Sequence, residues 1–138
     1  MEIVWLGEVA YREALDLQLS YLDRRATRRI RDTLLLLTHP HVYTLGRTGD
    51  ETNLLVSKET LASEGISVER VGRGGDITYH GFALNVTTDL SWFRRIHLCG
   101  LKGREATSIA EETGSAPTME AVRVAVAAAC NRHLEGFA

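Results

Sequence analysis

Apolar residues recur along the chain at spacings that predict short strands alternating with helices. The first apolar run, residues 3–6, has the length of a strand. From about residue 9 to residue 31 the spacing becomes helical, which predicts an amphipathic helix lying on a core. The apolar face of that helix would consist of Tyr11, Leu15, Leu19 and Leu22.

Four later segments have the apolar composition of strands: residues 33–37, 42–45, 67–71 and 82–86. His39 and Pro40 stand between the first two segments and predict a bend there. The run at 33–37 is apolar at nearly every position and does not alternate, so it predicts a buried strand. Residues 46–51 are polar and contain glycine, which predicts a loop.

Capping residues and spacing predict three further helical segments. Ser57 is a candidate N-cap for a short surface helix that Gly65 would end. Asp89 would cap one or two helical turns that reach residue 95. Pro117 suits the first turn of a C-terminal helix whose apolar residues continue at helical spacing to residue 134. Together these elements predict one mixed α/β or α+β domain that spans residues 1–138.

The composition is that of a folded globular chain. It has 138 residues, of which 44% are hydrophobic and 25% charged, enough for one compact core. Sixteen Lys and Arg against eighteen Asp and Glu give a net charge of −2, so no global basic field favours a nucleic-acid partner. A local positive excess lies at Arg24, Arg25, Arg28, Arg29 and Arg31. We interpret it first as a solvated helix face, next as a surface for an acidic protein and last as a nucleic-acid patch.

The sequence also bears on location and cysteine chemistry. The run of four leucines at residues 34–37 is far too short to cross a bilayer, and no basic leader precedes an apolar stretch. Two cysteines are too few for a disulfide scaffold and match no metal-ligand spacing, so free thiols are expected. These observations predict a cytoplasmic protein with no membrane partner and no metal.

Two segments carry candidate chemistry. Residues 72–81 hold three glycines around Arg73 and include His80; glycine lets a backbone approach a ligand closely, but a plain glycine turn explains the pattern equally well. Cys99 has arginines and a histidine nearby in the sequence, which makes it a candidate nucleophile, with an ordinary free thiol as the alternative. Cys130 falls on the apolar face of the last helix and is expected to be a buried structural thiol.

Four stretches of the chain resemble one protein family. They are residues 34–47 (LLLLTHPHVYTLGR), 69–81 (ERVGRGGDITYHG), 81–90 (GFALNVTTDL) and 96–101 (IHLCGL). They are similar to the octanoyltransferases of lipoate biosynthesis, the LipB family, and they follow one another in the family's order over nearly the whole chain. The resemblance implies the mixed α/β fold of the biotin and lipoate protein ligase catalytic domains.

The resemblance also implies an activity. Family members move an octanoyl group from octanoyl-acyl carrier protein to a lysine of a lipoyl-domain protein, through a thioester on a cysteine. The implied acceptors are E2 subunits of 2-oxoacid dehydrogenases and the H protein of glycine cleavage, and no cofactor is implied. By motif match Cys99 takes the place of the nucleophile. The implied substrate-binding residues are Arg73, Gly74, Gly75, Asp76, Ile77, Thr78, Tyr79 and His80, followed by Gly81, Phe82 and Ala83.

The chain departs from the family pattern after His80-Gly81. In the family, TYHG is followed by further core strands and a segment with a catalytic lysine, and only then by a second His-Gly that leads into GFALNV. Here Gly81 joins directly to Phe82, so we hypothesise an in-frame loss of the intervening segment, central strands included. Lys102 and His80 are the remaining candidate bases. A catalytically inactive homologue that only binds the acyl carrier or the lipoyl domain is the alternative hypothesis, and an ATP-dependent lipoate ligase is a weaker third.

Overall fold

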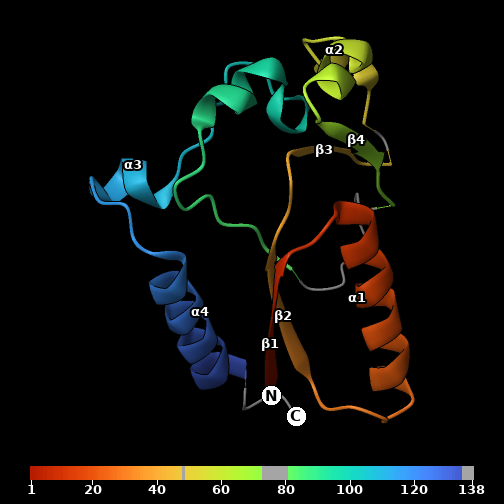
Figure 1. Ribbon diagram of the computed structural model, residues 1–138, viewed down its shortest axis with the longest axis vertical. Helices are drawn as coiled ribbons and strands as arrows, with labels where there is room; N and C mark the ends of the chain where they lie inside the picture. Colours follow the sequence, from red (N-terminus) through yellow and green to blue (C-terminus); the bar gives the residue numbers. More distant parts are fainter. Residues whose placement is uncertain (48, 73–80, 135–138) are drawn as a thin grey trace. The chain divides into compact units, whose positions relative to one another are not determined.

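A computed structural model describes residues 1–47, 49–72 and 81–134 (Figure 1). It divides into two compact units, one formed by residues 1–40 with the chain from Thr118 onward and one formed by residues 41–117. Each unit contains a parallel strand pair and at least one helix, so the predicted mixed α/β class is confirmed. That the whole chain acts as a single domain remains a prediction.

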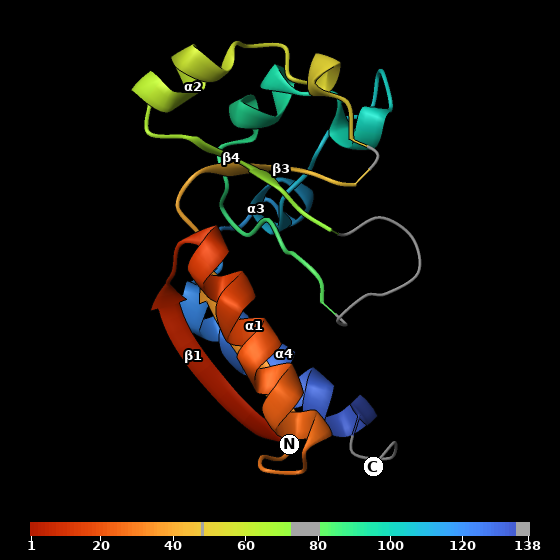
Figure 2. The same ribbon diagram turned by 90° about the vertical axis from the view of Figure 1, so that its right-hand side faces the viewer.

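The first unit is built on a β-α-β segment. Strand β1 (Glu2–Glu8), helix α1 (Tyr11–Ala26) and strand β2 (Thr33–Thr38) follow one another, and the two strands pair in parallel with Ile3 opposite Leu34. Helices α1 and α4 (Met119–Leu134) lie on opposite sides of this sheet in Figure 1, and Figure 2 shows α1 in front of α4 after the quarter turn. The guanidinium of Arg123 on α4 lies 4.5 Å from the ring centroid of Trp5 on β1, so α4 contacts the sheet through this cation–π pair.

The end of α1 has a specific hydrogen-bonded cap. The Arg29 N–H donates to the Arg24 carbonyl at 2.8 Å and the Arg28 N–H to the Arg25 carbonyl at 2.9 Å, which is the Schellman pattern. The residue that must adopt left-handed backbone in this pattern is usually glycine, but here it is Arg28, with φ of +56°. The helix therefore stops at Ala26, five residues earlier than the spacing predicted.

The second unit holds the larger buried core. Strand β3 (Val42–Leu45), the 3-10 turn η1 (Glu51–Asn53), helix α2 (Lys58–Ser63) and strand β4 (Ser67–Arg70) follow in order, and β3 and β4 pair in parallel. Buried Tyr43, Leu61 and Ile66 form the centre of this core. Half-buried apolar residues complete it: Leu54, Val56, Val68, Trp92 and Ile96.

Three short helices follow in the second unit, and most predicted caps are present. These are the 3-10 helices η2 (Leu90–Arg95) and η3 (Leu98–Gly100) and the α-helix α3 (Ile109–Thr113). The Ser57 hydroxyl accepts from the Thr60 N–H, Gly65 has φ of +75° after α2, and Asp89 accepts from the Ser91 N–H, so these three predictions are confirmed.

Some element predictions are wrong. Residues 82–86 form no strand; Phe82 and Leu84 are 63% and 49% exposed, and the described residues supply no neighbouring strand for them. Pro117 precedes α4 rather than sitting in its first turn, because Thr118 supplies the cap by accepting the Ala121 N–H. Helix α3 was not predicted, and Cys130 is half-buried rather than fully buried.

Replacing Arg28 with glycine is expected to stabilise the first unit. Left-handed backbone costs a non-glycine residue about 1–2 kcal/mol, so Arg28→Gly should raise the free energy of unfolding by about 1 kcal/mol, offset in part by the greater freedom of glycine in the unfolded chain. Denaturant unfolding monitored by circular dichroism measures the change. Arg31→Gly, at an exposed position without positive φ, is the control and should give no gain. Equal behaviour of the two variants would contradict the assignment of strain to Arg28.

Candidate functional site

The predicted nucleophile lies on a tight turn with unusual backbone. Cys99 is the middle residue of η3, it is exposed, and its φ of +52° and ψ of +27° place it in the left-handed region. Gly100 follows with φ of +72°. Two consecutive left-handed residues present the thiol on an exposed turn, and such backbone in a non-glycine residue persists only where the surroundings hold it.

Residues 95–97, just before Cys99, form backbone hydrogen bonds with residues 53–55 at the end of η1. The His97 N–H donates to the Asn53 carbonyl at 2.8 Å, and the Leu55 N–H donates to the Arg95 carbonyl at 2.8 Å. These bonds flank an antiparallel bridge between Leu54 and Ile96. We call this pairing of residues 53–55 with residues 95–97 the strap. It brings together residues about 40 positions apart and fixes where the Cys99 turn begins.

The strap rests on the core of the second unit. Leu54 and Ile96 both pack against the buried Tyr43–Leu61–Ile66 cluster. The Tyr43 hydroxyl donates to the Trp92 carbonyl at 2.7 Å, which ties η2 to strand β3. Burial of that ring raises the pKa of Tyr43 above its ordinary value, with Arg95 opposing the rise and Glu64 adding to it. The segment that leads into the Cys99 turn is thus held by the packing of Leu54 and Ile96 and by the hydrogen bond of the Tyr43 hydroxyl.

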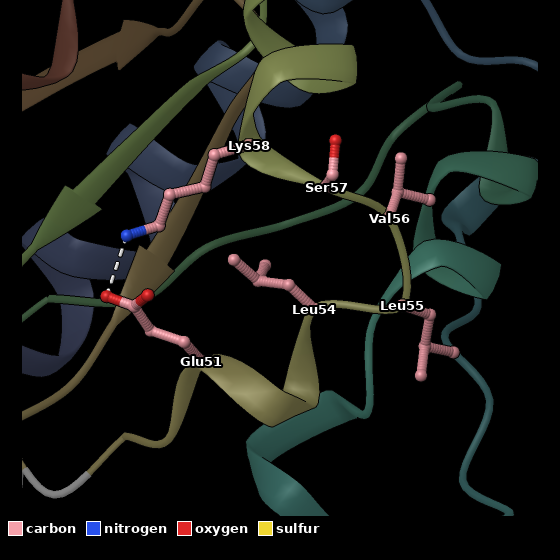
Figure 3. Close-up of a pocket in the computed structure, with 6 residues that line it drawn as sticks. All are labelled: Glu51, Leu54, Leu55, Val56, Ser57 and Lys58. Carbon is pink, nitrogen blue, oxygen red and sulfur yellow. Dashed lines mark ion pairs between the residues drawn. The ribbon is translucent and has the colours of Figure 1, made fainter.

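A carboxylate network holds the beginning of the strap. The Oε1 atom of Glu51 on η1 forms ion pairs with Lys58 Nζ on α2 at 2.7 Å and with Arg70 Nη2 on β4 at 2.9 Å. The bond from Lys58, followed by that from Arg70, holds the pKa of Glu51 below its ordinary value. Figure 3 shows Glu51 and Lys58 facing one another beside an open hollow of about 290 Å³. Leu54, Leu55, Val56 and Ser57 complete the lining of that hollow.

The implied substrate-binding residues are only partly within the described chain. Arg73 to His80 lie outside the described residues, so their placement near Cys99 stays a prediction. Gly81, Phe82 and Ala83 are described and exposed. The chain becomes anchored again at Asn85 and Val86, whose carbonyls accept the Ile109 and Ala110 N–H groups.

The candidate bases and metal ligands show no assembled centre among the residues described. No hydrogen bond or ion pair to the Cys99 thiol is found there, and Lys102 is exposed without an ion pair. Lys58 is paired with Glu51, and His80 lies outside the described residues. In the same part of the chain, no group of three His, Cys, Asp or Glu side chains could hold a metal ion, and no helix is long and apolar enough to cross a membrane.

Sequence reasoning missed the role of residues 51–55. Asn53 supplies the carbonyl that holds His97, and its side-chain Nδ2 lies 3.6 Å from where a Cβ of Gly100 would be. Asn53 lies in a short turn capped by Asp50 and is not part of a helix or strand periodicity that a sequence pattern could reveal. Its partner, His97, is 44 residues further along the chain. Only the apolar pair Leu54-Leu55 after that turn could have indicated a short core-facing segment there.

Comparison with known proteins finds matches over most of the chain. The model of the lipoyl protein ligase A/B catalytic domain matches residues 10–82. An octanoyltransferase of Dictyoglomus thermophilum is 34% identical, over 84% of this chain and 79% of that protein. One from Nitratidesulfovibrio vulgaris is 32% identical over 89% of each. One from Caldicellulosiruptor bescii is 49% identical over 59% of this chain, which corresponds to 36% of that protein.

The lengths of these matches differ in an informative way. The Dictyoglomus alignment runs over 184 positions, whereas 84% of 138 residues is about 116, so about 68 positions face a gap in this chain. The Caldicellulosiruptor match covers 81 residues, about a third of that relative, and the domain model stops at residue 82. Cys99 therefore lies outside the region matched by the domain model and is reached by alignments that bridge a large gap.

The stability of the strap is expected to depend on Glu51 ionisation. Because the folded-state pKa of Glu51 is lowered, its contribution is fully present above the ordinary glutamate range and is lost as pH falls through the lowered value. Wild type should therefore lose more stability than Glu51→Gln as the pH falls from neutral through the lowered pKa of Glu51, and the two should converge below it. Denaturant unfolding at a series of pH values measures this; Glu105→Gln, at an exposed loop position, should follow wild type throughout.

Proposed function

The chain belongs to the lipoyl protein ligase A/B catalytic-domain family and to its octanoyltransferase members, and we propose that it transfers octanoyl groups through a thioester on Cys99. The proposal extends to this chain the activity for which its relatives are named. The observation that carries it is the Cys99 turn, an exposed thiol held in left-handed backbone by the strap.

The geometry supports nucleophilic chemistry at this thiol. A sulfur nucleophile attacks an acyl thioester well, and a covalent acyl-enzyme divides one transfer into two easier steps. Both steps need the sulfur to be reachable by large protein substrates. Cys99 meets this requirement because it is exposed, and the exposure of Phe82 and Ala83 leaves apolar surface for an acyl chain.

The partners follow from the proposed activity. The donor is octanoyl-acyl carrier protein, and the acceptors are lysines of lipoyl domains, as in E2 subunits of 2-oxoacid dehydrogenases and the H protein of glycine cleavage. Neither step needs ATP or a metal, and the reaction fits the cytoplasm. Acyl carriers are commonly acidic, so the exposed Arg94 or the arginines at the end of α1 are candidate docking charges.

We further propose that the chain is one catalytic domain shortened internally at Gly81-Phe82. Three observations support this position. About 68 positions of the Dictyoglomus alignment face gaps in this chain, and the match to the domain model ends at residue 82. The exposed Phe82 and Leu84 are the residues that a removed neighbouring strand would leave uncovered.

A second function has its own supporting observation. Among the described residues no base contacts Cys99, so none of them is placed to take up the thiol proton. A chain that keeps its docking surface but lacks a base beside the thiol would bind the acyl carrier or a lipoyl domain without turnover. This catalytically inactive homologue is the alternative to the transferase.

Incubation with octanoyl-acyl carrier protein is expected to leave one octanoyl group on the chain. Cys99→Ala should abolish the adduct, a loss of at least about a thousandfold in rate, while Cys130→Ala, which removes the other free thiol, should retain it. Intact-mass spectrometry detects the adduct, and hydroxylamine should release it because thioesters are cleaved readily. Absence of the adduct in wild type, or its persistence in Cys99→Ala, would sink the transferase proposal.

The alternative function makes a different prediction about binding. An inactive homologue would bind octanoyl-acyl carrier protein or a lipoyl domain equally well in wild type and Cys99→Ala, with no product from either. Isothermal titration calorimetry measures binding, and mass analysis of the lipoyl domain measures product. Octanoylated lipoyl domain formed by wild type alone would exclude the inactive homologue.

A further inference from the structure

Acyl transfer to a thiol needs more than a nucleophile. As the Cys99 sulfur attacks the thioester carbonyl, charge develops on the carbonyl oxygen, and donors aimed at that oxygen are usually the largest source of rate acceleration. Such donors are often the backbone N–H of the residue after the nucleophile. The surroundings of Gly100 therefore decide where an oxyanion site could form.

The backbone donors that follow Cys99 are already engaged. The Gly100 N–H donates to the His97 carbonyl at 3.0 Å, and the Leu101 N–H donates to the Leu98 carbonyl at 2.9 Å. Both bonds close the turn that holds the thiol. The donor for an oxyanion must therefore come from another part of the chain or replace one of these bonds.

The Asn53 side chain carries a donor beside Gly100, the residue that follows Cys99. Its Nδ2 and Oδ1 lie 3.6 and 3.9 Å from the position a Cβ on Gly100 would take, so the carboxamide lies in van der Waals range of the residue next to Cys99. Asn53 is half-buried, and no hydrogen bond to its carboxamide is found among the described residues. Its own carbonyl is fixed by the His97 N–H at 2.8 Å, which holds the residue in register with the turn.

We infer that Asn53 is a catalytic residue whose Nδ2–H donates to the oxyanion formed on Cys99. This inference rests on the proposed function. The Cys99 thiolate forms a C–S bond to the acyl carbon, and the carbonyl electron pair moves to oxygen, where the Asn53 carboxamide stabilises it. Collapse of the intermediate expels the carrier thiolate, which takes up the proton that Cys99 released. In the second step a lysine amine forms a C–N bond to the same carbon and builds an oxyanion that uses the same donor. Collapse of that intermediate breaks the C–S bond and expels the Cys99 thiolate, which takes up the proton released by the amine.

Two replacements separate donation from packing. Asn53→Ala removes the carboxamide and leaves a smaller side chain. Asn53→Leu keeps a similar volume without a donor, so Asn53→Leu should fold even if Asn53→Ala loosens the strap. Acylation by octanoyl-acyl carrier protein should fall about 10²–10³-fold in both. Alkylation of Cys99 by iodoacetamide builds no oxyanion, so its rate should stay within about threefold of wild type. Thr52→Ala, at an exposed position in the same turn, should leave both rates unchanged.

The outcomes are distinguishable. Equal losses of acylation and alkylation, or acylation retained by Asn53→Leu, would overturn the catalytic role and leave Asn53 a structural residue. Absence of carrier-dependent acylation in wild type would overturn the proposed function. In that case acylation by p-nitrophenyl octanoate, which needs no carrier, is compared between wild type and the Asn53 variants. The difference in rate measures the contribution of Asn53 independently of carrier binding. If this ester also fails to acylate wild type, both proposals are overturned.

Discussion

The pairing of Leu54 with Ile96 is the contact on which the candidate site depends. A left-handed cysteine costs about 1–2 kcal/mol of backbone energy and would relax if the chain around it were free. The two backbone hydrogen bonds of the strap and the packing of half-buried Ile96 against the Tyr43–Leu61–Ile66 cluster supply the restraint. The same pairing sets Asn53 beside Gly100, so one short bridge positions both the thiol and the amide assigned to the oxyanion.

The two parallel sheets are narrow, and the strap does not cover their strands. All-parallel sheets are ordinarily covered on both faces, and β2, almost entirely leucine, has the composition of a strand buried in that way. Every residue of β2 is nevertheless only half-buried, and its paired neighbour among the described strands is β1 alone. The second pair, β3 with β4, is equally narrow. Sequence composition here matches a wider sheet than the described residues form, which agrees with an internal loss.

Much of the fold could be predicted from local physics, whereas the site could not. The Ser57 and Asp89 caps and the Gly65 stop follow from side-chain chemistry within three residues, so the sequence displays them directly. Residues 82–86 have strand composition, but a strand also needs a partner, and composition cannot supply one. The placement of Asn53 depends on a pairing about 40 residues away in the chain, for which no local pattern exists. Cys99 was predicted from motif resemblance, and its left-handed backbone was not.

The strap joins residues that lie on opposite sides of the proposed internal loss. Residues 53–55 precede Gly81-Phe82 and residues 95–97 follow it, yet they pair through backbone bonds and share one core. The position of Cys99 relative to β3 therefore does not require the absent segment. Phe82 and Leu84, by contrast, lie at the proposed junction itself and are exposed. An internal loss of this kind separates two properties of an acyltransferase: it spares the placement of the nucleophile and opens the surface that would shelter the acyl chain.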